Sequence, residues 1–263
     1  MSDDTETDVI RVAVLGAAGR MGTAVVAAVT EADGLDLVAA VDPGAAGTTL
    51  QGCAVLADTA DLDASAIDVV IDFTHPDAAR ANLAWAAAAG VHAVVGTSGF
   101  TEAEIAGIAA EFTASSCLIV PNFAIGAVLM MRFAAVAAPF FDTAEIIELH
   151  HDNKVDAPSG TAVRTAEQMA AASTEWAEDP TRTETIAHAR GAVGPAGIPI
   201  HSVRMRGMIA HQEVLLGAAG QTLSIRHDSY DRESFMPGVV LAVRSVADRP
   251  GVTVGLESAL GLG

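Results

Sequence analysis

Short apolar runs alternate with longer helical segments through the first half of the chain. Residues 9–15 (VIRVAVL) are rich in β-branched side chains and end at a glycine, which is typical of a strand buried on both faces. Further strands are predicted at residues 37–41, 69–73, 91–95 and 117–120, and helices at residues 23–31, 76–89 and 102–112. Strands that alternate with helices indicate a parallel sheet with right-handed crossovers, so we expect an α/β domain.

The pattern changes after residue 123. An apolar helix is predicted at residues 124–137, strands at 145–150, 200–205, 213–216 and 223–226, and further helices at 161–172 and 235–246. Consecutive strands at short spacing favour an antiparallel or mixed sheet, and therefore a second domain of the α+β type. The last helix is expected to pack back on the first domain. The loop at residues 177–199 is rich in Gly, Pro and polar residues and is a candidate flexible element.

A glycine-rich segment, GAAGRMG at residues 16–22, lies between the first predicted strand and the first helix. Glycines at such a turn let backbone N–H groups approach a pyrophosphate, which the start of the helix also attracts. Asp42 ends the second strand, where a carboxylate can accept hydrogen bonds from the adenosine ribose hydroxyls. The alternative is an ordinary glycine turn with a surface aspartate. We interpret the segment as a dinucleotide site formed by Gly16, Ala17, Ala18, Gly19, Arg20 and Met21.

The residue type at position 42 also bears on the choice of cofactor. A carboxylate there repels a ribose 2′-phosphate, which NADPH carries and NADH lacks. Asp42 is followed by Pro43 rather than by an arginine that would neutralise the phosphate. NADH is therefore the favoured cofactor, with NADPH as the alternative.

Two shorter motifs follow the fourth and fifth predicted strands. GTSGF begins at Gly96 and VPNF ends at Phe123, and ligands of such folds bind at the carboxyl ends of parallel strands. Their backbone and hydroxyl groups are expected to face the nicotinamide. The alternatives are a strand–helix turn capped by Thr or Ser, and a helix start capped by Asn122. The candidate residues are Gly96, Thr97, Ser98, Val120, Pro121, Asn122 and Phe123.

The densest group of reactive side chains is HHDNKVDAPSGTA at residues 150–162, between a predicted strand and a helix. The helix start can bind a carboxylate or phosphate, and an ammonium and imidazoles beside it complete a site for an anionic substrate and a proton donor. The alternative is a polar loop before an ordinary helix start. The two histidines point in opposite directions on an extended strand, so a bend is needed to bring both to one cleft. The candidates are His150, His151, Lys154, Gly160 and Thr161.

Charge and cysteine content narrow the class of protein. With 33 acidic and 14 basic residues, the net charge of −19 excludes a binder of the nucleic-acid backbone, which needs a basic face. Lys154 is the single lysine, a composition that favours a halophilic protein of a high-salt cytoplasm over an ordinary acidic one.

Two cysteines make no disulfide framework, and the Cys and His spacing matches no metal motif, so no metal is predicted. Arg190, Arg204, Arg206 and Arg232 are candidates for the substrate or for ion pairs between subunits.

The chain also lacks the expected features of export and of membrane insertion. The N-terminal MSDDTETD has neither the basic nor the apolar region of a signal peptide, so we expect a disordered tail and a cytoplasmic protein. The longest apolar stretch, residues 124–141, is interrupted by Gly126, Arg132 and Pro139, which favours a buried helix over a membrane span.

Taken together, GAAGRMG, IDFTHP (residues 71–76), GTSGF, VPNF and HHDNKVDAPSGTA resemble the motifs of the 4-hydroxy-tetrahydrodipicolinate reductase family, formerly called dihydrodipicolinate reductases. The motifs fall in the family's order and spacing. The resemblance implies a Rossmann-type parallel sheet with a second α+β domain containing a mixed sheet. Residues 1–123 and 232–263 would form the dinucleotide-binding domain, and residues 124–231 the substrate-binding domain, which also forms a homotetramer.

The resemblance also implies roles for the candidate residues. By position, residues 16–21 would hold the pyrophosphate, Asp42 the ribose, and the GTSGF and VPNF segments the nicotinamide. His150 matches the family's proton donor or acceptor, Lys154 its proton donor, and His151, Gly160 and Thr161 its substrate contacts. Members with Glu-Arg at the ribose position can use NADPH through the arginine, which Asp42-Pro43 lacks.

The activity that the resemblance implies is the reduction of 4-hydroxy-tetrahydrodipicolinate in the diaminopimelate pathway of lysine biosynthesis. Loss of the 4-hydroxyl as water gives a conjugated imine of a small cyclic dicarboxylate. Hydride passes to C4, and the resulting enamine is protonated with His150 or Lys154 involved. Two alternatives are a two-domain dehydrogenase acting on another acid, and a regulator that binds the nucleotide without turnover.

Overall fold

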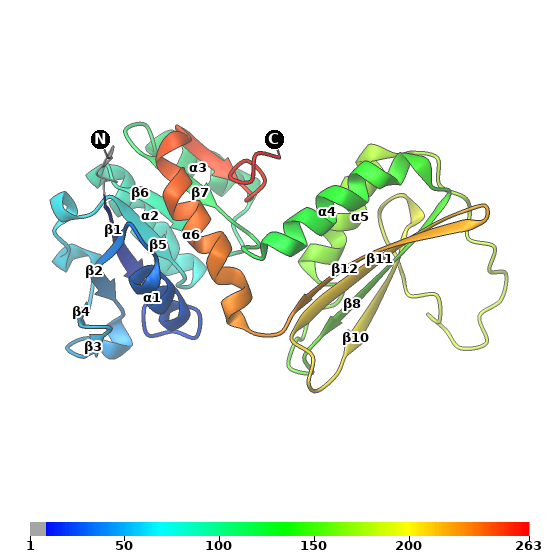
Figure 1. The fold of residues 1–263 in the computed structure, drawn as a ribbon, viewed down its shortest axis with the longest axis horizontal. Coiled ribbons are helices and arrows are strands. Elements are labelled where there is room, and N and C mark those ends of the chain that lie inside the picture. The colour runs from blue at the N-terminus through cyan, green and yellow to red at the C-terminus, as the bar shows by residue number, and fades with distance from the viewer. Residues whose placement is uncertain (1–8, 263) are drawn as a thin grey trace, which may run out of the picture. The chain divides into compact units, whose positions relative to one another are not determined.

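The computed structural model describes residues 9–262, which form two compact units. One unit combines the residues up to Phe123 with those from Phe235 onward, and the other is Ala124–Ser234 (Figure 1). The segment MSDDTETD, predicted as a tail, lies outside the described residues. Within residues 9–262, none of the helices has the length and apolar character that a membrane span needs.

The first unit is built on an eight-stranded sheet with helices on both faces. Its strands are β1 (Ile10–Leu15), β2 (Leu35–Val41), β3 (Thr49–Leu50), β4 (Cys53–Leu56), β5 (Val69–Asp72), β6 (His92–Val95), β7 (Ser116–Ile119) and β13 (Gly251–Val254). Its helices are α1 (Gly22–Glu31), α2 (Pro76–Ala89), α3 (Glu102–Glu111) and α6 (Met236–Ser245). Neighbouring strands run in the order β13-β7-β6-β5-β1-β2-β4-β3, and all these pairs are parallel except β3 with β4. The predicted Rossmann-type sheet is confirmed.

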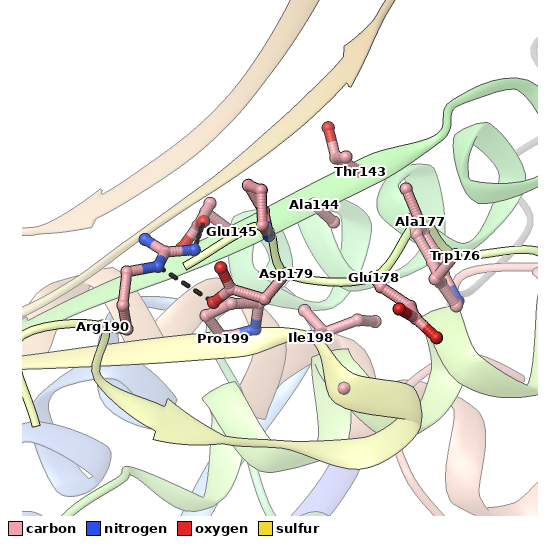
Figure 2. A pocket seen from close by; sticks show the side chains of 12 residues that line it. Thr143, Ala144, Glu145, Trp176, Ala177, Glu178, Asp179, Arg190, Ile198 and Pro199 are labelled. Carbon is pink, nitrogen blue, oxygen red and sulfur yellow. Dashed lines mark hydrogen bonds and ion pairs between the residues drawn. The ribbon is translucent and has the colours of Figure 1, made fainter. Parts of the chain in front are cut away.

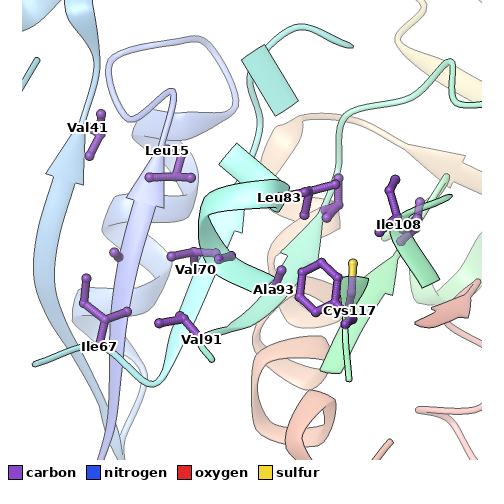
Figure 3. Close-up of a cluster of buried hydrophobic side chains, with 14 of the residues drawn as sticks. Leu15, Val41, Ile67, Val70, Leu83, Val91, Ala93, Ile108 and Cys117 are labelled. Carbon is purple, nitrogen blue, oxygen red and sulfur yellow. The ribbon is translucent and has the colours of Figure 1, made fainter. Parts of the chain in front are cut away.

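The central strands are continuous apolar runs because both of their faces are buried. Val14 and Leu15 point to opposite faces of β1, yet each is at most 1% exposed. Leu15 lies in one core cluster with Leu83 of α2 and Ile108 of α3 (Figure 3). On the other face, α1 packs against β1 and α6. The predicted last helix therefore does return to the first unit.

The order of the strands fixes where a ligand can bind. Because β1 lies between β2 and β5, the direction in which successive strands are added reverses at β1. In open α/β sheets the crevice at such a switch point, outside the carboxyl ends of the strands, is the ligand site. Strands β3, β4 and β13 were not predicted, and the two residues of β3 are too few to show a periodicity.

The second unit has a mixed five-stranded sheet. Its strands are β8 (Thr143–His150), β9 (Ala192–Val193), β10 (Pro199–Arg204), β11 (Ala210–Ala218) and β12 (Gln221–Ser229), and its helices are α4 (Ile125–Ala137) and α5 (Gly160–Ala172). The order is β12-β11-β8-β10-β9, with β8 and β10 parallel and the other pairs antiparallel. The helices α4 and α5 pack against each other, with α4 on β12 and α5 on β8. The predicted mixed sheet is confirmed.

Short 3-10 helices occur in both units. They lie at Pro43–Ala45, Thr59–Asp61, Ala64–Ala66, Ala138–Phe140, Pro195–Gly197, Arg232–Phe235 and Val246–Asp248.

Strand β8 alternates between a buried face and a partly exposed face. Ala144 and Ile146 are buried on one face, and Glu145 and Ile147 are half-buried on the other. The next position on the buried face is Glu148, whose side chain is fully buried. A carboxylate thus occupies a position where the strand pattern calls for an apolar residue, and burying it requires compensating partners.

Candidate active site

The loop between β1 and α1 is folded against the end of β2. The backbone N–H groups of Gly16 and Ala17 donate to the carbonyl oxygen of Val41 at 2.8 and 3.1 Å. Gly16 has a φ of +77°, and a Cβ added at Gly22 would lie 1.9 Å from the carbonyl oxygen of Gly16. Glycine is therefore required at both positions. The N-cap residue Met21 makes no side-chain hydrogen bond to α1, which leaves the helix start to attract an anion.

Asp42 ties this loop to the turn that follows β2. Its Oδ2 accepts the N–H of Ala18 at 3.0 Å, and its Oδ1 accepts the N–H of Gly44 at 3.0 Å. Each carboxylate oxygen keeps a further lone pair, since an ionised carboxylate can accept about four hydrogen bonds. The carboxylate is thus held at the mouth of the glycine-rich loop with acceptor capacity to spare.

A buried aspartate that sequence reasoning missed organises the next two strand ends. Asp72 closes β5 with no exposed surface, and its Oδ1 accepts the hydroxyls of Thr74 and Thr97, each at 2.8 Å. Its Oδ2 accepts the Asn82 amide at 2.7 Å. The hydroxyl proton of Thr97 therefore points into the protein, so this predicted site residue can offer a ligand its backbone more readily than its side-chain donor.

Close ring packing brings the ends of β5, β6 and β7 together. A Cβ added at Gly96 would lie 2.1 Å from the Phe73 ring, so only glycine fits beside it. The ring of Phe73 packs on Phe123, with centroids 5.4 Å apart. Val120 is buried like Phe123, whereas Ser98 is exposed. The GTSGF and VPNF segments thus share the edge of the sheet that carries the glycine-rich loop.

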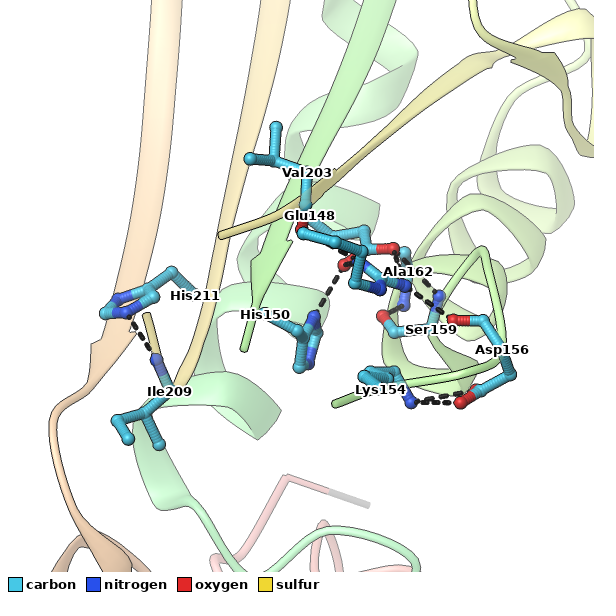
Figure 4. A network of polar contacts seen from close by, with 10 residues as sticks. Glu148, His150, Lys154, Asp156, Ser159, Ala162, Val203, Ile209 and His211 are labelled. Atoms are coloured by element: carbon cyan, nitrogen blue, oxygen red, sulfur yellow. Dashed lines mark hydrogen bonds and ion pairs between the residues drawn. The ribbon is translucent and has the colours of Figure 1, made fainter. Parts of the chain in front are cut away.

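Glu148 and His150 form a close carboxylate–imidazole pair at the end of β8 (Figure 4). Nδ1 of His150 lies 2.5 Å from Oε2 of Glu148. Arg204 of β10 donates from Nη1 to Oε2 at 2.8 Å and from Nη2 to Oε1 at 2.9 Å. The N–H of Ser159 also donates to Oε1, at 3.2 Å. Both oxygens of the buried carboxylate are therefore satisfied.

These contacts decide the charge of Glu148 and the tautomer of its partner. Burial raises the pKa of a carboxyl group, but hydrogen bonds from His150, Arg204 and Ser202 outweigh it and hold the pKa of Glu148 at about 2. Glu148 is ionised at neutral pH and has no proton to give, so Nδ1 of His150 is the donor. The other ring nitrogen, Nε2, is then the one that can take up or release a proton to a ligand.

Lys154 lies in the loop that joins β8 to α5. Its Nζ donates to both carboxylate oxygens of Asp156, at 2.9 and 2.8 Å, and this contact lowers the pKa of Asp156. Arg204 holds the same loop through the carbonyl of Asp156, at 2.6 Å. Strand β8 ends at His150, so His151 already belongs to the loop and is exposed. The chain therefore leaves the strand directly after His150, at the position where a bend was expected between His150 and His151.

The start of α5 lies next to this loop. Ser159 is its N-cap residue, and its hydroxyl oxygen accepts the N–H of Ala162 at 3.2 Å. Gly160 and Thr161 form the first turn, and a Cβ added at Gly160 would meet no heavy atom within 4 Å. The positive end of the helix is thus open to an anion beside Lys154.

Two of the three remaining arginine candidates, Arg190 and Arg206, form ion pairs within the second unit, and the third, Arg232, is exposed. Arg190 pairs with Glu145 at 2.5 Å and with Asp179 at 3.0 Å, in the wall of a pocket of about 250 Å³ (Figure 2). Arg206 pairs with Asp152 at 2.9 Å. Apart from Arg190, none of the predicted site residues lines the pocket in Figure 2. Between residues 9 and 262 there is also no cluster of His, Cys, Asp and Glu that could hold a metal ion.

The chain combines an α/β unit of the dinucleotide-binding type with an α+β unit that carries an imidazole–carboxylate pair. This combination is typical of two-domain nicotinamide-dependent oxidoreductases. The chain belongs to the dihydrodipicolinate reductase family. Residues 10–123 match the family's N-terminal model and residues 126–260 its C-terminal model.

Individual relatives cover nearly the whole chain. The 4-hydroxy-tetrahydrodipicolinate reductase of Cutibacterium acnes is 53% identical over 259 residues, which are 96% of this chain and 99% of that protein. The enzyme of the same name from Nocardia farcinica is 52% identical over 260 residues, with the same two coverages. A dipicolinate-bound dihydrodipicolinate reductase from Paenisporosarcina has a TM-score of 0.86 at 39% identity, covering 95% of this chain and 99% of its own. An amine dehydrogenase from Mycobacterium smegmatis, 16% identical with a TM-score of 0.62, shares the fold alone.

Proposed function

We propose that this chain reduces 4-hydroxy-tetrahydrodipicolinate to tetrahydrodipicolinate with NADH or NADPH, in the diaminopimelate route to lysine. The observation that carries the proposal is the match of both halves of the chain to one reductase family. The chemistry of the described residues agrees with it, because a dinucleotide-type loop lies in one unit and a proton-carrying imidazole beside an ammonium in the other.

The first unit would bind the cofactor. Residues 16–21 would hold the pyrophosphate at the start of α1, and Asp42 the ribose hydroxyls. The segments that would line the nicotinamide side are Gly96, Thr97, Ser98, Val120, Pro121, Asn122 and Phe123. NADH is favoured over NADPH because two backbone N–H groups, of Ala18 and Gly44, fix the Asp42 carboxylate where it would meet a 2′-phosphate.

The second unit would bind the substrate, a small cyclic dicarboxylate. The start of α5, where the space beside Gly160 is open and Thr161 follows, is suited to one carboxylate, and Lys154 and His151 are suited to the charges of the substrate. The solved relative from Paenisporosarcina is dipicolinate-bound, and dipicolinate is a cyclic dicarboxylate of the same kind. An acidic protein can bind such a dianion only where local positive charge outweighs the net charge of −19.

Proton transfer would fall to His150 and Lys154. NADH or NADPH, held by the first unit, would supply the hydride for C4 of the conjugated imine that remains once the 4-hydroxyl has left as water. The resulting enamine needs one proton, and Nε2 of His150 is the nitrogen positioned to give it because Glu148 occupies Nδ1. Lys154 would orient the carboxylate and assist that transfer.

We also propose that the chain acts as a cytoplasmic homotetramer. The face of the second unit's sheet that is turned away from α4 and α5 carries half-buried apolar side chains, among them Ile147, Leu149 and Leu215. A second copy of the chain would cover this face. Light scattering should give four times the chain mass of 26.7 kDa, and a monomer at working concentration would contradict the proposal.

The activity is tested by following NADH oxidation in a high-potassium buffer. Substrate is generated in place from pyruvate and aspartate semialdehyde by a purified synthase, and NADPH is run in parallel. Oxidation that depends on the synthase supports the reductase proposal and ranks the two cofactors. A folded protein that binds NADH without synthase-dependent oxidation would overturn it, and a panel of amino-acid and semialdehyde substrates would follow.

A further inference from the structure

Burying the carboxylate of Glu148 costs free energy, and this cost suggests that the residue serves a purpose other than stability. Its side chain is fully buried in the row of β8 that also buries Ala144 and Ile146, where an apolar residue would pack without penalty. Replacing a buried ion pair with apolar residues is often neutral or stabilising, so the Glu148–Arg204 pair is poorly explained by stability alone.

The contacts of Glu148 converge on the proposed proton-transfer residues. Oε2 accepts Nδ1 of His150 at 2.5 Å, and Oε1 accepts the N–H of Ser159, the residue that caps α5. Arg204 contacts both oxygens and reaches the carbonyl of Asp156 in the loop that carries Lys154. One buried carboxylate thus anchors the imidazole directly, and the lysine loop through its arginine.

We propose that Glu148 is the positioning residue for His150: it keeps Nδ1 protonated in both the neutral ring and the imidazolium, so that Nε2 is the nitrogen that takes up a proton and then gives it to the enamine. This inference deepens the proposed function and rests on it for the role of His150. Without the carboxylate, the neutral ring of His150 can carry its proton on either nitrogen. The fraction of molecules with the proton on Nδ1, and with Nε2 available for proton transfer, then falls. The loss in Glu148→Gln would appear in the chemical step rather than in substrate binding, because a glutamine amide oxygen can still accept the Ser159 N–H that ties this position to the start of α5.

The chain offers a matched control on the same strand. Glu145, three residues earlier and on the other face of β8, also pairs with one histidine and one arginine: His201 at 2.6 Å and Arg190 at 2.5 Å. Glu145→Gln removes the same charge from the same strand without touching the proposed site. Both variants lose one carboxylate charge from β8, but only Glu148→Gln changes the contact to His150.

The experiment compares Glu148→Gln with Glu145→Gln and the unaltered chain. Nitrogen-15 spectra at alkaline pH, where imidazoles are neutral, report the tautomer, and the His150 signals are assigned by their loss in His150→Gln. We expect a single Nδ1–H tautomer in the unaltered chain and in Glu145→Gln, and a mixture in Glu148→Gln. In Glu148→Gln, kcat should fall by about 100-fold while KM changes by less than about threefold.

A second variant guards against loss of folding. Glu148→Gln leaves Arg204 buried without its counter-charge, so Glu148→Gln with Arg204→Gln removes both charges together. The double variant should fold, show mixed tautomers and keep the low kcat. An unchanged tautomer with kcat within about twofold of the unaltered chain, in either variant that folds, would overturn the proposal. If the unaltered chain has no reductase activity, the proposed function fails, and the spectra still decide whether Glu148 sets the tautomer.

Discussion

Oδ2 of Asp42 accepts the backbone N–H of Ala18 at 3.0 Å, so the residue that follows β2 is bound to the glycine-rich loop that follows β1. The contact fixes a negative charge at the place where the proposed dinucleotide site would hold a ribose. We therefore expect the cofactor preference to depend on this one side chain, which can be tested directly.

Asp42→Asn should raise the use of NADPH relative to NADH. The amide keeps an acceptor for Ala18 but no longer repels a 2′-phosphate, so the ratio of kcat/KM values should move toward NADPH by about tenfold or more. The matched control is Asp36→Asn, which removes an exposed carboxylate elsewhere on the same strand. Steady-state kinetics with both cofactors check the expectation, and an equal ratio in Asp42→Asn and Asp36→Asn would contradict it.

Lys154→Ala should reduce turnover sharply. Lys154 is the single lysine of the chain, and its ammonium pairs with Asp156 in the loop that precedes α5, with 21% of its side chain exposed. We expect kcat/KM for the dicarboxylate to fall by about 100-fold or more. Arg206→Gln removes an equal charge from a nearby side chain that is 92% exposed, and it should retain nearly full activity. A near-normal rate for Lys154→Ala would remove the role assigned to this residue.

Asp72→Asn should destabilise the first unit. The buried carboxylate accepts hydrogen bonds from Thr74, Thr97 and Asn82, and an amide nitrogen in place of one oxygen faces donors instead of acceptors. The free energy of unfolding should fall by about 1–3 kcal/mol in urea denaturation. Asp77→Asn, at a fully exposed position of α2, should cause no measurable change. Similar midpoints for the two variants would show that the Asp72 cluster contributes nothing to stability.

Glu148 should also contribute to the acid sensitivity of the fold. Its pKa is about 2 in the folded chain, below the ordinary 4.5, because hydrogen bonds from His150 and Arg204 outweigh the effect of burial. A depressed pKa stabilises the folded state fully above the ordinary value, and this contribution is lost as the pH falls from 4.5 toward 2. Denaturation across that window should show a shallower loss of stability in Glu148→Gln than in the unaltered chain. Parallel curves would argue against the contact.

Salt should stabilise this protein more than it stabilises a chain of balanced charge. A net charge of −19 repels itself, and the Debye length shrinks from about 10 Å at 0.1 M salt to about 3 Å at 1 M. The melting temperature should therefore rise with potassium chloride over this range. Sucrose, which screens no charge, is the control for solvent exclusion. A melting temperature that rises with sucrose but not with salt would contradict the halophilic interpretation.

The sequence by itself determined the elements and most of the chemistry. Residues 12–15 had to be a buried strand because four apolar side chains follow one another there without a polar break. The glycines at positions 16 and 22 had to form a tight turn, since no side chain fits against the neighbouring backbone. The histidines, the lysine and the start of α5 fall within thirteen residues, so their neighbourhood is local and visible in the chain.

The tertiary structure decided which distant residues complete the site. Glu148 and Arg204 are 56 positions apart, and they meet because β10 lies parallel to β8 in one particular register. The pairing of Asp72 with Thr97 likewise depends on β5 and β6 being neighbours. Glu148, at an otherwise apolar position of its strand, was the one sequence signal for the buried ion pair. The sequence did not indicate that Arg204 would be its partner. Strand pairing depends on the packing of the whole sheet, and a shift of one residue would turn each side chain to the other face.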